Sequence, residues 1–314
     1  ADHMAPITSF FDHDLPFLHE NGSLVSYRGD RSTTLSYDGH TGWDYALRPP
    51  DPVLAAADGT VVFAGNSDDG CGVAHVVIID HDNGYRTLYW HMSEVLAQPG
   101  PVKRGERIGI VGSSGCATGP HLHFQVQYLG RDVDPYGWCG PKGDDPWARY
   151  PGGQVSTWLW SWMPSPCNIP QGATLVDTGD AAFHKRGDGW QELAGGLGGT
   201  SLRVTSVVSS SVDVPTGSWQ PDLPIAGRYR LLAWVPYIDN GLSDASSVTY
   251  TVTFATGSKT VNVDQSVTAN TWVELGSYDF TSRGGAVRLE AHDGAAANGT
   301  TNVWFDALIW MKEP

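Results

Sequence analysis

Three short stretches of the chain hold histidine and aspartate at spacings that suit a metal ion. His40 and Asp44 stand four residues apart, His121 and His123 stand two apart, and His91 ends a short β-like run. Residues two apart in a strand point to the same face, so His121 and His123 would share one side. Neutral imidazole and carboxylate are ligands that zinc takes at sites open to water. Each pair alone is a weak signal, but together they indicate zinc chemistry.

The remaining histidines give no such pattern. His81 lies in a turn, and we expect a surface role for it. His3 belongs to a first tetrapeptide that resembles a vector remnant, so it is set aside. Five others lack a second candidate ligand at a regular offset and are interpreted as incidental: His13, His19, His75, His184 and His292.

The candidate residues fall among short β-rich runs separated by glycine-centred turns. This texture predicts an antiparallel β-domain around them. Gly39 and Gly42 predict an extended turn for the stretch that holds residues 40–44. The expected strands cover 60–64, 76–79, 85–90, 108–111 and 121–128.

Composition bounds the fold and the partners. The 314 residues include 38 Gly and 20 Pro, too many chain-breaking residues for a mostly helical protein. We therefore expect an all-β protein with two domains. The net charge of −15 argues against a nucleic-acid partner. The sequence has no apolar run of the ~18–20 residues that a membrane span needs and no apolar leader, so we expect a soluble, mature form.

Four cysteines support export. Cys71, Cys116, Cys139 and Cys167 lack the spacing of a structural zinc site, so two disulfides are expected, although four buried thiols are an alternative. Three connectivities are open. Cys71–Cys116 with Cys139–Cys167 is preferred, because it keeps the second bridge within a Trp-rich segment. Disulfides would place the protein outside the cytosol.

The amino-acid composition and the spacing of the expected strands change twice along the chain. Residues 136–170 are rich in Trp, Pro and Gly, which favours a segment packed on the first domain over a flexible linker. Strands resume after 173 with the regular spacing of a jelly-roll-like β-sandwich. The predicted domains are 5–137, a connecting segment 138–172, and 173–314. The later strands are expected at 227–235, 248–254, 260–263, 272–275 and 286–289.

The first domain resembles the lysostaphin-type (LytM-like) zinc endopeptidases, which cut peptidoglycan peptides. The resemblance covers roughly residues 37–136. It departs from the family pattern in the bulky Trp43 and Trp90 and in the flanking Cys71 and Cys116, and we expect the larger side chains to change the shape of the groove but not the metal site. The segments that carry it are 39–45, 52–61, 77–81, 87–93, 102–109, 119–126 and 133–135.

The resemblance implies a role for each candidate residue. It assigns Zn²⁺ to His40, Asp44 and His123, and it makes His91 and His121 the catalytic pair. Three protein ligands leave a fourth position for a zinc-bound water, the expected nucleophile. One imidazole of the pair would move the proton while the other stabilises the oxyanion, and the sequence leaves open which does which.

The second domain resembles the golvesin-like C-terminal β-sandwich of secreted bacterial proteins, and it shows no second catalytic set. The supporting segments are 176–180, 219–224, 227–229, 261–265, 272–276 and 305–308. A glycan or cell-surface ligand is plausible for this domain, and clustered Asp could hold calcium. Four tryptophans are weighed as sugar platforms or, more commonly, as core residues: Trp190, Trp219, Trp234 and Trp272.

These inferences predict a secreted, cell-wall-associated, monomeric zinc metalloendopeptidase that hydrolyses stem or cross-bridge peptides of bacterial peptidoglycan. Two alternatives stay open. One is a secreted metallopeptidase of Gly-rich proteins, with the same chemistry on another substrate. The other is a catalytically inactive wall-binding or regulatory protein, which is disfavoured because all five site residues are present. A purely carbohydrate-binding protein would leave those five residues unexplained.

Overall fold

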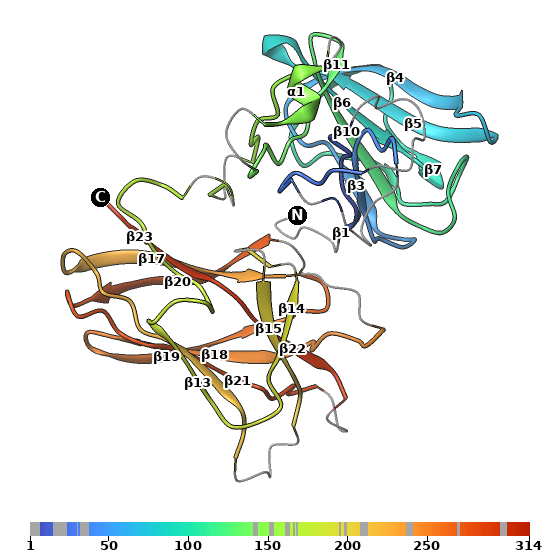
Figure 1. Cartoon of the computed structure of the whole chain (residues 1–314). Helices are drawn as coiled ribbons and strands as arrows, with labels where there is room; N and C mark the ends of the chain where they lie inside the picture. The colour runs from blue at the N-terminus through green and yellow to red at the C-terminus, as the bar shows by residue number, and fades with distance from the viewer. Residues whose placement is uncertain are drawn as a thin grey trace. The chain divides into compact units, whose positions relative to one another are not determined.

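A computed structural model shows two compact units, residues 1–167 and 168–314 (Figure 1). Each unit is described by itself. The residues described are 7–14, 24–29, 31, 38–140, 144–150, 154–160, 164–165, 167, 169–194, 196–197, 200–207, 213–236, 241–268, 271–295 and 300–314.

One antiparallel sheet forms the body of the first unit. Its strands run in the order β1-β2-β10-β6-β5-β4-β8, and β11 pairs with the end of β10. A smaller sheet has the order β3-β9-β7. The large-sheet strands are β1 (Ile7–Ser9), β2 (Trp43–Tyr45), β4 (Gly59–Asp68), β5 (Val73–Asp80), β6 (Tyr85–Trp90), β8 (Gly100–Val102), β10 (Leu122–Tyr128) and β11 (Arg131–Asp132). The small-sheet strands are β3 (Pro52–Leu54), β7 (Glu94–Val95) and β9 (Arg107–Ile110).

The long strands follow from their β-branched and aromatic residues. In β5, Val76, Val77 and Ile79 are fully buried, and β6 contributes the buried Tyr89 to the same core. Each of the five strands expected in this unit overlaps an observed strand, so the antiparallel β-domain is confirmed. A 3-10 turn, η1 (Asp82–Gly84), joins β5 to β6.

The prediction of an extended turn for residues 40–44 was wrong at its C-terminal end. Trp43 and Asp44 belong to strand β2, which lies between β1 and β10. The glycines obscured this short strand, because Gly42 is needed for close packing and not for a turn. A Cβ on Gly42 would come 2.6 Å from the carbonyl oxygen of Phe124 and 2.8 Å from His123 Nε2.

Aromatic residues after β11 pack on the first unit. Trp147, in the short helix α1 (Pro146–Arg149), meets Phe11 edge to face with ring centroids 5.6 Å apart. Trp158 meets Tyr136 in the same manner at 5.4 Å. Trp162 lies outside the described residues. The boundaries at 137 and 173 remain predictions.

The first unit contains two disulfides. They pair Cys71 with Cys116 and Cys139 with Cys167, so the preferred connectivity is confirmed. The second bridge closes the Trp-rich segment on itself, while the first joins the β4–β5 turn to the loop before β10.

The second unit is a sandwich of antiparallel sheets, as the sequence predicted. Its described strands form sheets of order β12-β23-β17-β20, β13-β16-β21-β18-β19 and β14-β15-β22. The strand bounds are β12 (Thr174–Val176), β13 (Phe183–Arg186), β14 (Gln191–Ala194), β15 (Thr200–Thr205), β16 (Thr216–Trp219), β17 (Gly227–Val235), β18 (Val248–Phe254), β19 (Gly257–Val263), β20 (Thr271–Phe280), β21 (Val287–Glu290), β22 (Asn302–Phe305) and β23 (Leu308–Lys312).

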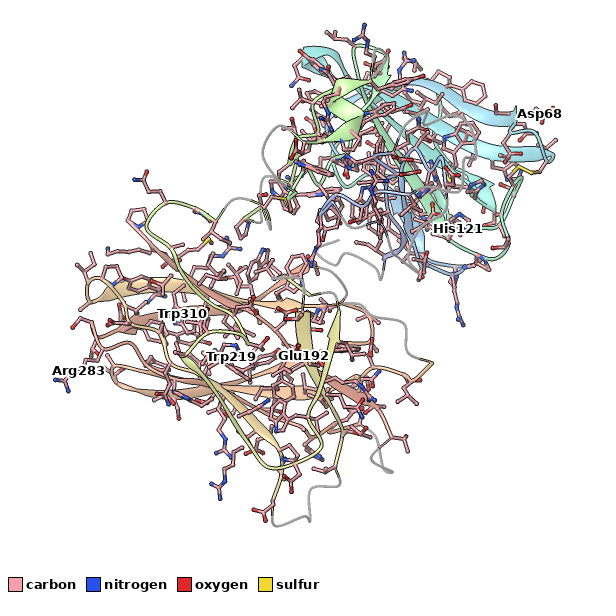
Figure 2. The ribbon with its side chains drawn as sticks, viewed as in Figure 1. Asp68, His121, Glu192, Trp219, Arg283 and Trp310 are labelled. Carbon is pink, nitrogen blue, oxygen red and sulfur yellow. A yellow bond between two sulfur atoms is a disulfide. The ribbon has the colours of Figure 1, made fainter. Side chains whose placement is uncertain are left out.

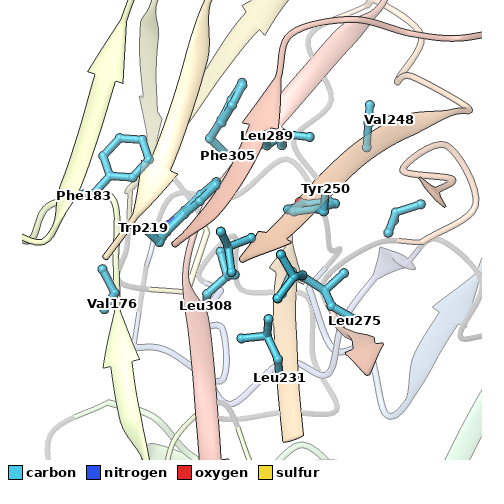
Figure 3. Close-up of a cluster of buried hydrophobic side chains, with 14 of the residues drawn as sticks. Val176, Phe183, Trp219, Leu231, Val248, Tyr250, Leu275, Leu289, Phe305 and Leu308 are labelled. Carbon is cyan, nitrogen blue, oxygen red and sulfur yellow. The ribbon is translucent and has the colours of Figure 1, made fainter. Parts of the chain in front are cut away.

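A single hydrophobic core fills the space between the two larger sheets (Figure 3). Leu231 and Leu275 enter it from one sheet, and Trp219, Tyr250 and Leu289 enter from the other. The alternating burial of β18 shows the period of two expected when one face of a strand covers a core. No helix among the described residues is long and apolar enough to cross a membrane.

Candidate metal centre and active site

The main sheet of the first unit sets two candidate ligands opposite each other. Strand β2 pairs with β10 in a register that places Asp44 directly across from His123. Directly paired residues of neighbouring strands share a face, so the side chains of Asp44 and His123 lie side by side on one face of the sheet. His40 lies just before β2, and all three side chains are buried.

The three ligand atoms form a nearly regular triangle. His40 Nε2 lies 3.2 Å from Asp44 Oδ1 and 3.0 Å from His123 Nδ1, and the last two atoms are 3.0 Å apart. Ligands of a tetrahedral zinc ion sit ~2.0–2.2 Å from the metal and hence ~3.3–3.6 Å from one another. The triangle is therefore close to one face of a zinc tetrahedron, and it needs only a small expansion to fit.

The hydrogen bonds of His40 also favour a metal ion at this site. His40 Nδ1 is 2.8 Å from the carbonyl oxygen of Phe10 and donates to it, so a neutral imidazole here, the form that binds a metal, carries its lone pair on Nε2. That lone pair faces Asp44 Oδ1 and His123 Nδ1. Two imidazole nitrogens and a carboxylate oxygen at these distances repel one another unless a proton or a cation lies among them. The donor set thus fits zinc.

The pKa values favour the protonation states that metal ligands need. Burial raises the pKa of Asp44, but the neighbouring imidazoles of His123 and His40 outweigh it and hold the pKa well below its usual range. Burial lowers the pKa of His123 to about 4. At neutral pH Asp44 is therefore a carboxylate and His123 a neutral imidazole.

His91 and His121 stand beside this triangle. Their ring centroids are 4.8 Å apart, and His121 Nε2 is 3.8 Å from Asp44 Oδ1. The side chain of His121 is 16% exposed, so it is open to a substrate (labelled in Figure 2). Each ring donates through Nδ1 to a backbone carbonyl, of Ser114 for His91 and of Gly119 for His121, which leaves Nε2 free for chemistry. Burial lowers the pKa of His91.

The structure thus brings together all five residues chosen from the sequence. A second group of described residues, Asp69 with Cys71 and Cys116, also lies within metal-binding distance. Its two sulfur atoms are joined in a disulfide, so they are not available as metal ligands.

Sequence reasoning missed a buried charge cluster that is hydrogen-bonded to strand β2. His13, interpreted as incidental, is fully buried, with Nδ1 2.8 Å from Asp145 and Nε2 2.8 Å from Asp134. Burial lowers the pKa of His13, but the two carboxylates outweigh it and raise the pKa to about 9. Asp134 also accepts a hydrogen bond from Trp43 Nε1. No local spacing could reveal partners more than 120 residues away in the chain.

The bulky residue at 43 does not shape the groove directly. Trp43 is 1% exposed and stacks on Tyr136, with ring centroids 3.7 Å apart. Its size is therefore accommodated in the core and not at the substrate side.

Three of the four tryptophans weighed as sugar platforms belong to the core of the second unit. Trp219, Trp234 and Trp272 are at most 3% exposed and cannot stack on a ligand. Trp190 is partly exposed and packs against Phe305 with ring centroids 4.7 Å apart. The structure therefore excludes a platform built from the first three residues.

Comparison with known proteins assigns families to both units. Residues 38–135 match Peptidase family M23, and residues 174–308 match the Golvesin C-terminal domain. The chain thus carries an M23 peptidase domain of the LytM/lysostaphin type followed by a golvesin C-terminal domain, as the resemblance predicted.

Curated relatives match the peptidase domain. The chain is 46% identical over 96 residues to "DD-carboxypeptidase/endopeptidase Mpg" of Neisseria meningitidis, covering 31% of this chain and 22% of that protein. It is 41% identical over 96 residues to "Peptidoglycan DD-endopeptidase ShyA" of Vibrio cholerae, covering 30% and 22%. It is 37% identical over 101 residues to "Murein hydrolase activator NlpD" of Escherichia coli, covering 32% and 26%. The chain spans only about a fifth to a quarter of these relatives.

Solved structures of the same family are also similar to this chain. The catalytic domain of the antimicrobial peptidase lysostaphin from Staphylococcus simulans is 37% identical, with a TM-score of 0.28, and the match covers 31% of this chain and 75% of that one. The catalytic domain of the prophage-encoded M23 protein EnpA from Enterococcus faecalis is 32% identical, with a TM-score of 0.31 and coverage of 42% and 88%.

Proposed function

We propose that this chain is a secreted zinc endopeptidase that hydrolyses peptide bonds in the stem or cross-bridge peptides of bacterial peptidoglycan. The observation that carries the proposal is the buried triangle of His40, Asp44 and His123 with His91 and His121 at its edge. The names of two relatives, a DD-carboxypeptidase/endopeptidase and a peptidoglycan DD-endopeptidase, support the substrate class.

His40, Asp44 and His123 would hold the metal through Nε2, Oδ1 and Nδ1. A zinc ion there supplies a Lewis acid and lowers the pKa of water toward neutrality. The carbonyl oxygen of Phe10 orients the His40 ring, and the register of β2 with β10 fixes Asp44 against His123. Such support from rigid strands keeps the ligand atoms in place through turnover.

His91 and His121 act on the substrate through their Nε2 atoms. One Nε2 takes a proton from the attacking water and returns it to the leaving amine. The other, once protonated, donates a hydrogen bond to the oxyanion that forms at the scissile carbonyl. Because a hydrogen bond at Nδ1 fixes the orientation of each ring, Nε2 already faces the substrate side before the substrate binds.

An activator without catalysis is the alternative, since one relative is named a murein hydrolase activator. The presence of all five residues in one cluster favours the enzyme. A peptidase of Gly-rich proteins would share the same site and differ only in substrate. The two disulfides support export, because such bonds persist in oxidising compartments.

Metal removal tests the proposed function. The purified chain is treated with a chelator, dialysed and assayed for release of new amino groups from purified peptidoglycan. We expect activity to disappear and to return as zinc approaches one equivalent. Undiminished release by the metal-free chain would contradict a zinc enzyme, and no release at any zinc level would favour the activator.

A further inference from the structure

The loop between β9 and β10 holds His91 from two directions. The Ser114 carbonyl oxygen accepts from His91 Nδ1 at 2.7 Å, and the Ser114 backbone N–H donates to the His91 carbonyl oxygen at 3.4 Å. The Ser114 hydroxyl donates to Met92 O at 2.7 Å and accepts from the His75 N–H at 2.9 Å. His91 has φ of +66°, a left-handed conformation that a non-glycine residue keeps only when its surroundings fix it.

This loop is in turn fastened to the turn between β4 and β5 by one carboxylate. Asp69 Oδ2 accepts from the Cys116 backbone N–H at 2.6 Å, and Oδ1 accepts from the Cys71 backbone N–H at 3.2 Å. The Cys71–Cys116 disulfide joins the same two segments (near Asp68 in Figure 2). The contact is close, because a Cβ on Gly115 would collide with Asp69 Oδ2 and come within 2.7 Å of Ala74 Cβ.

The carboxylate also faces the histidine. Asp69 Oδ2 lies 3.9 Å from His91 Nδ1, and the two side chains are only 10% and 9% exposed. Burial raises the pKa of Asp69, but the N–H donors of Cys116 and Cys71 outweigh it, so the group is ionised. A negative charge on this side of the ring favours the proton on Nδ1 and leaves the lone pair on Nε2.

We propose that Asp69 is a positioning residue for His91. It holds the Ser114 loop through the Cys116 N–H and, with the charge beside Nδ1, keeps His91 in the tautomer that presents an unprotonated Nε2. The inference rests on the proposed function, because it assigns His91 a role in turnover. Asp69 contacts none of the proposed metal ligands among the printed interactions, so its loss should act through His91 and not through the metal.

The test compares Asp69→Ala and Asp69→Asn with Asp68→Asn. Asp68 is the adjacent exposed carboxylate, and it accepts only from the Gly70 N–H among its printed bonds, so it controls for charge and for the turn. Each variant is examined by nitrogen-15 NMR of the His91 imidazole, by zinc content, and by kcat and KM on peptidoglycan fragments. We expect Asp69→Ala to mix the two His91 tautomers and to lower kcat by ~10-fold or more, with KM and zinc unchanged. Asp69→Asn keeps an acceptor and should retain part of the kcat.

Two outcomes would overturn the inference. One is a single Nδ1–H tautomer with parental kcat in Asp69→Ala. The other is an equal kcat loss in Asp68→Asn. If Asp69→Ala does not fold, Asp69→Asn carries the same measurements, and a parental tautomer and kcat in Asp69→Asn would overturn the inference. If the parent chain cleaves nothing, the proposed function fails, while the NMR comparison still decides whether Asp69 sets the tautomer.

Discussion

The five histidine and aspartate residues of the site divide into two sets by what each nitrogen or oxygen faces. His40, Asp44 and His123 turn their free atoms toward one another, within 3.0–3.2 Å. His91 and His121 turn Nδ1 to a backbone carbonyl and leave Nε2 for a substrate. Metal content and rate should therefore respond separately to substitutions in the two sets.

Removal of a proposed ligand should remove the metal. His123→Ala takes one corner from the triangle, and two remaining ligands do not hold zinc tightly. Elemental analysis after dialysis should find zinc in the parent and almost none in this variant. Full retention of zinc by a folded His123→Ala protein would show that the ligand set is wrong.

Removal of a proposed catalytic histidine should leave the metal. His121→Ala keeps the triangle intact but loses one Nε2, so we expect near-parental zinc and turnover reduced by roughly 10²-fold or more. His91→Ala should behave in the same way. Cleavage of peptidoglycan by His121→Ala at the parental rate would refute the proposed mechanism.

The buried His13 predicts a pH-dependent stability. Its pKa is near 9 in the folded chain and 6.5 as a free side chain, so its stabilising contribution is complete below pH 6.5 and is lost as pH rises through about 9. Tm measured between pH 7 and 10 should fall more steeply for the parent than for His13→Gln. The exposed His184→Gln serves as the control and should follow the parent.

At the scale of elements, the long strands were predicted correctly from the sequence. Asp44 was expected in a turn but belongs to a strand. Strands such as β17 and β18 coincide with their expected bounds, because long β-branched and aromatic runs have few alternatives. Strand β2 has three residues and follows Gly42, so its local pattern resembles a turn. Only its pairing with β1 and β10 makes it a strand, and such tertiary contacts leave no periodic signal.

The pairing of β2 with β10 gives a prediction about Gly42. Gly42→Ala places a methyl group against His123 Nε2 and the Phe124 carbonyl, so the strand or the ligand must move. We expect a loss of about 1–3 kcal/mol in the free energy of unfolding and weaker zinc binding. Urea unfolding and zinc competition measure both.

Gly119→Ala is the matched control for Gly42→Ala. No atom lies within 4 Å of its added Cβ, and the carbonyl that orients His121 is kept. Parental stability and zinc affinity in Gly42→Ala, or equal losses in both variants, would show that close packing at position 42 is unimportant.

On the scale of the whole molecule, acidic residues outnumber basic ones in both units, and the net charge is −15. Anionic wall polymers would repel such a protein electrostatically. Salt limits this repulsion to a screening length of ~8 Å at physiological ionic strength. Capture of a wall must then come from short-range contacts. We propose that the golvesin domain supplies them through neutral, salt-tolerant contacts with a glycan or surface ligand.

Truncation tests this placement. A chain ending at Pro170 should cleave small soluble peptides at the parental rate and bind whole cell walls more weakly. Binding of the full chain should persist as salt is raised. Equal wall binding by the two forms in a pull-down would leave the second unit with a structural role only.

The most direct test of the central claim is mass spectrometry of peptidoglycans digested with the zinc-loaded chain. Substrates with different cross-bridges are compared, with His121→Ala as the control that keeps its metal. The account predicts fragments that each carry a new amino terminus in a stem or cross-bridge peptide, and none with His121→Ala. Intact peptides in every substrate, or fragments cut only in the glycan strands, would contradict it.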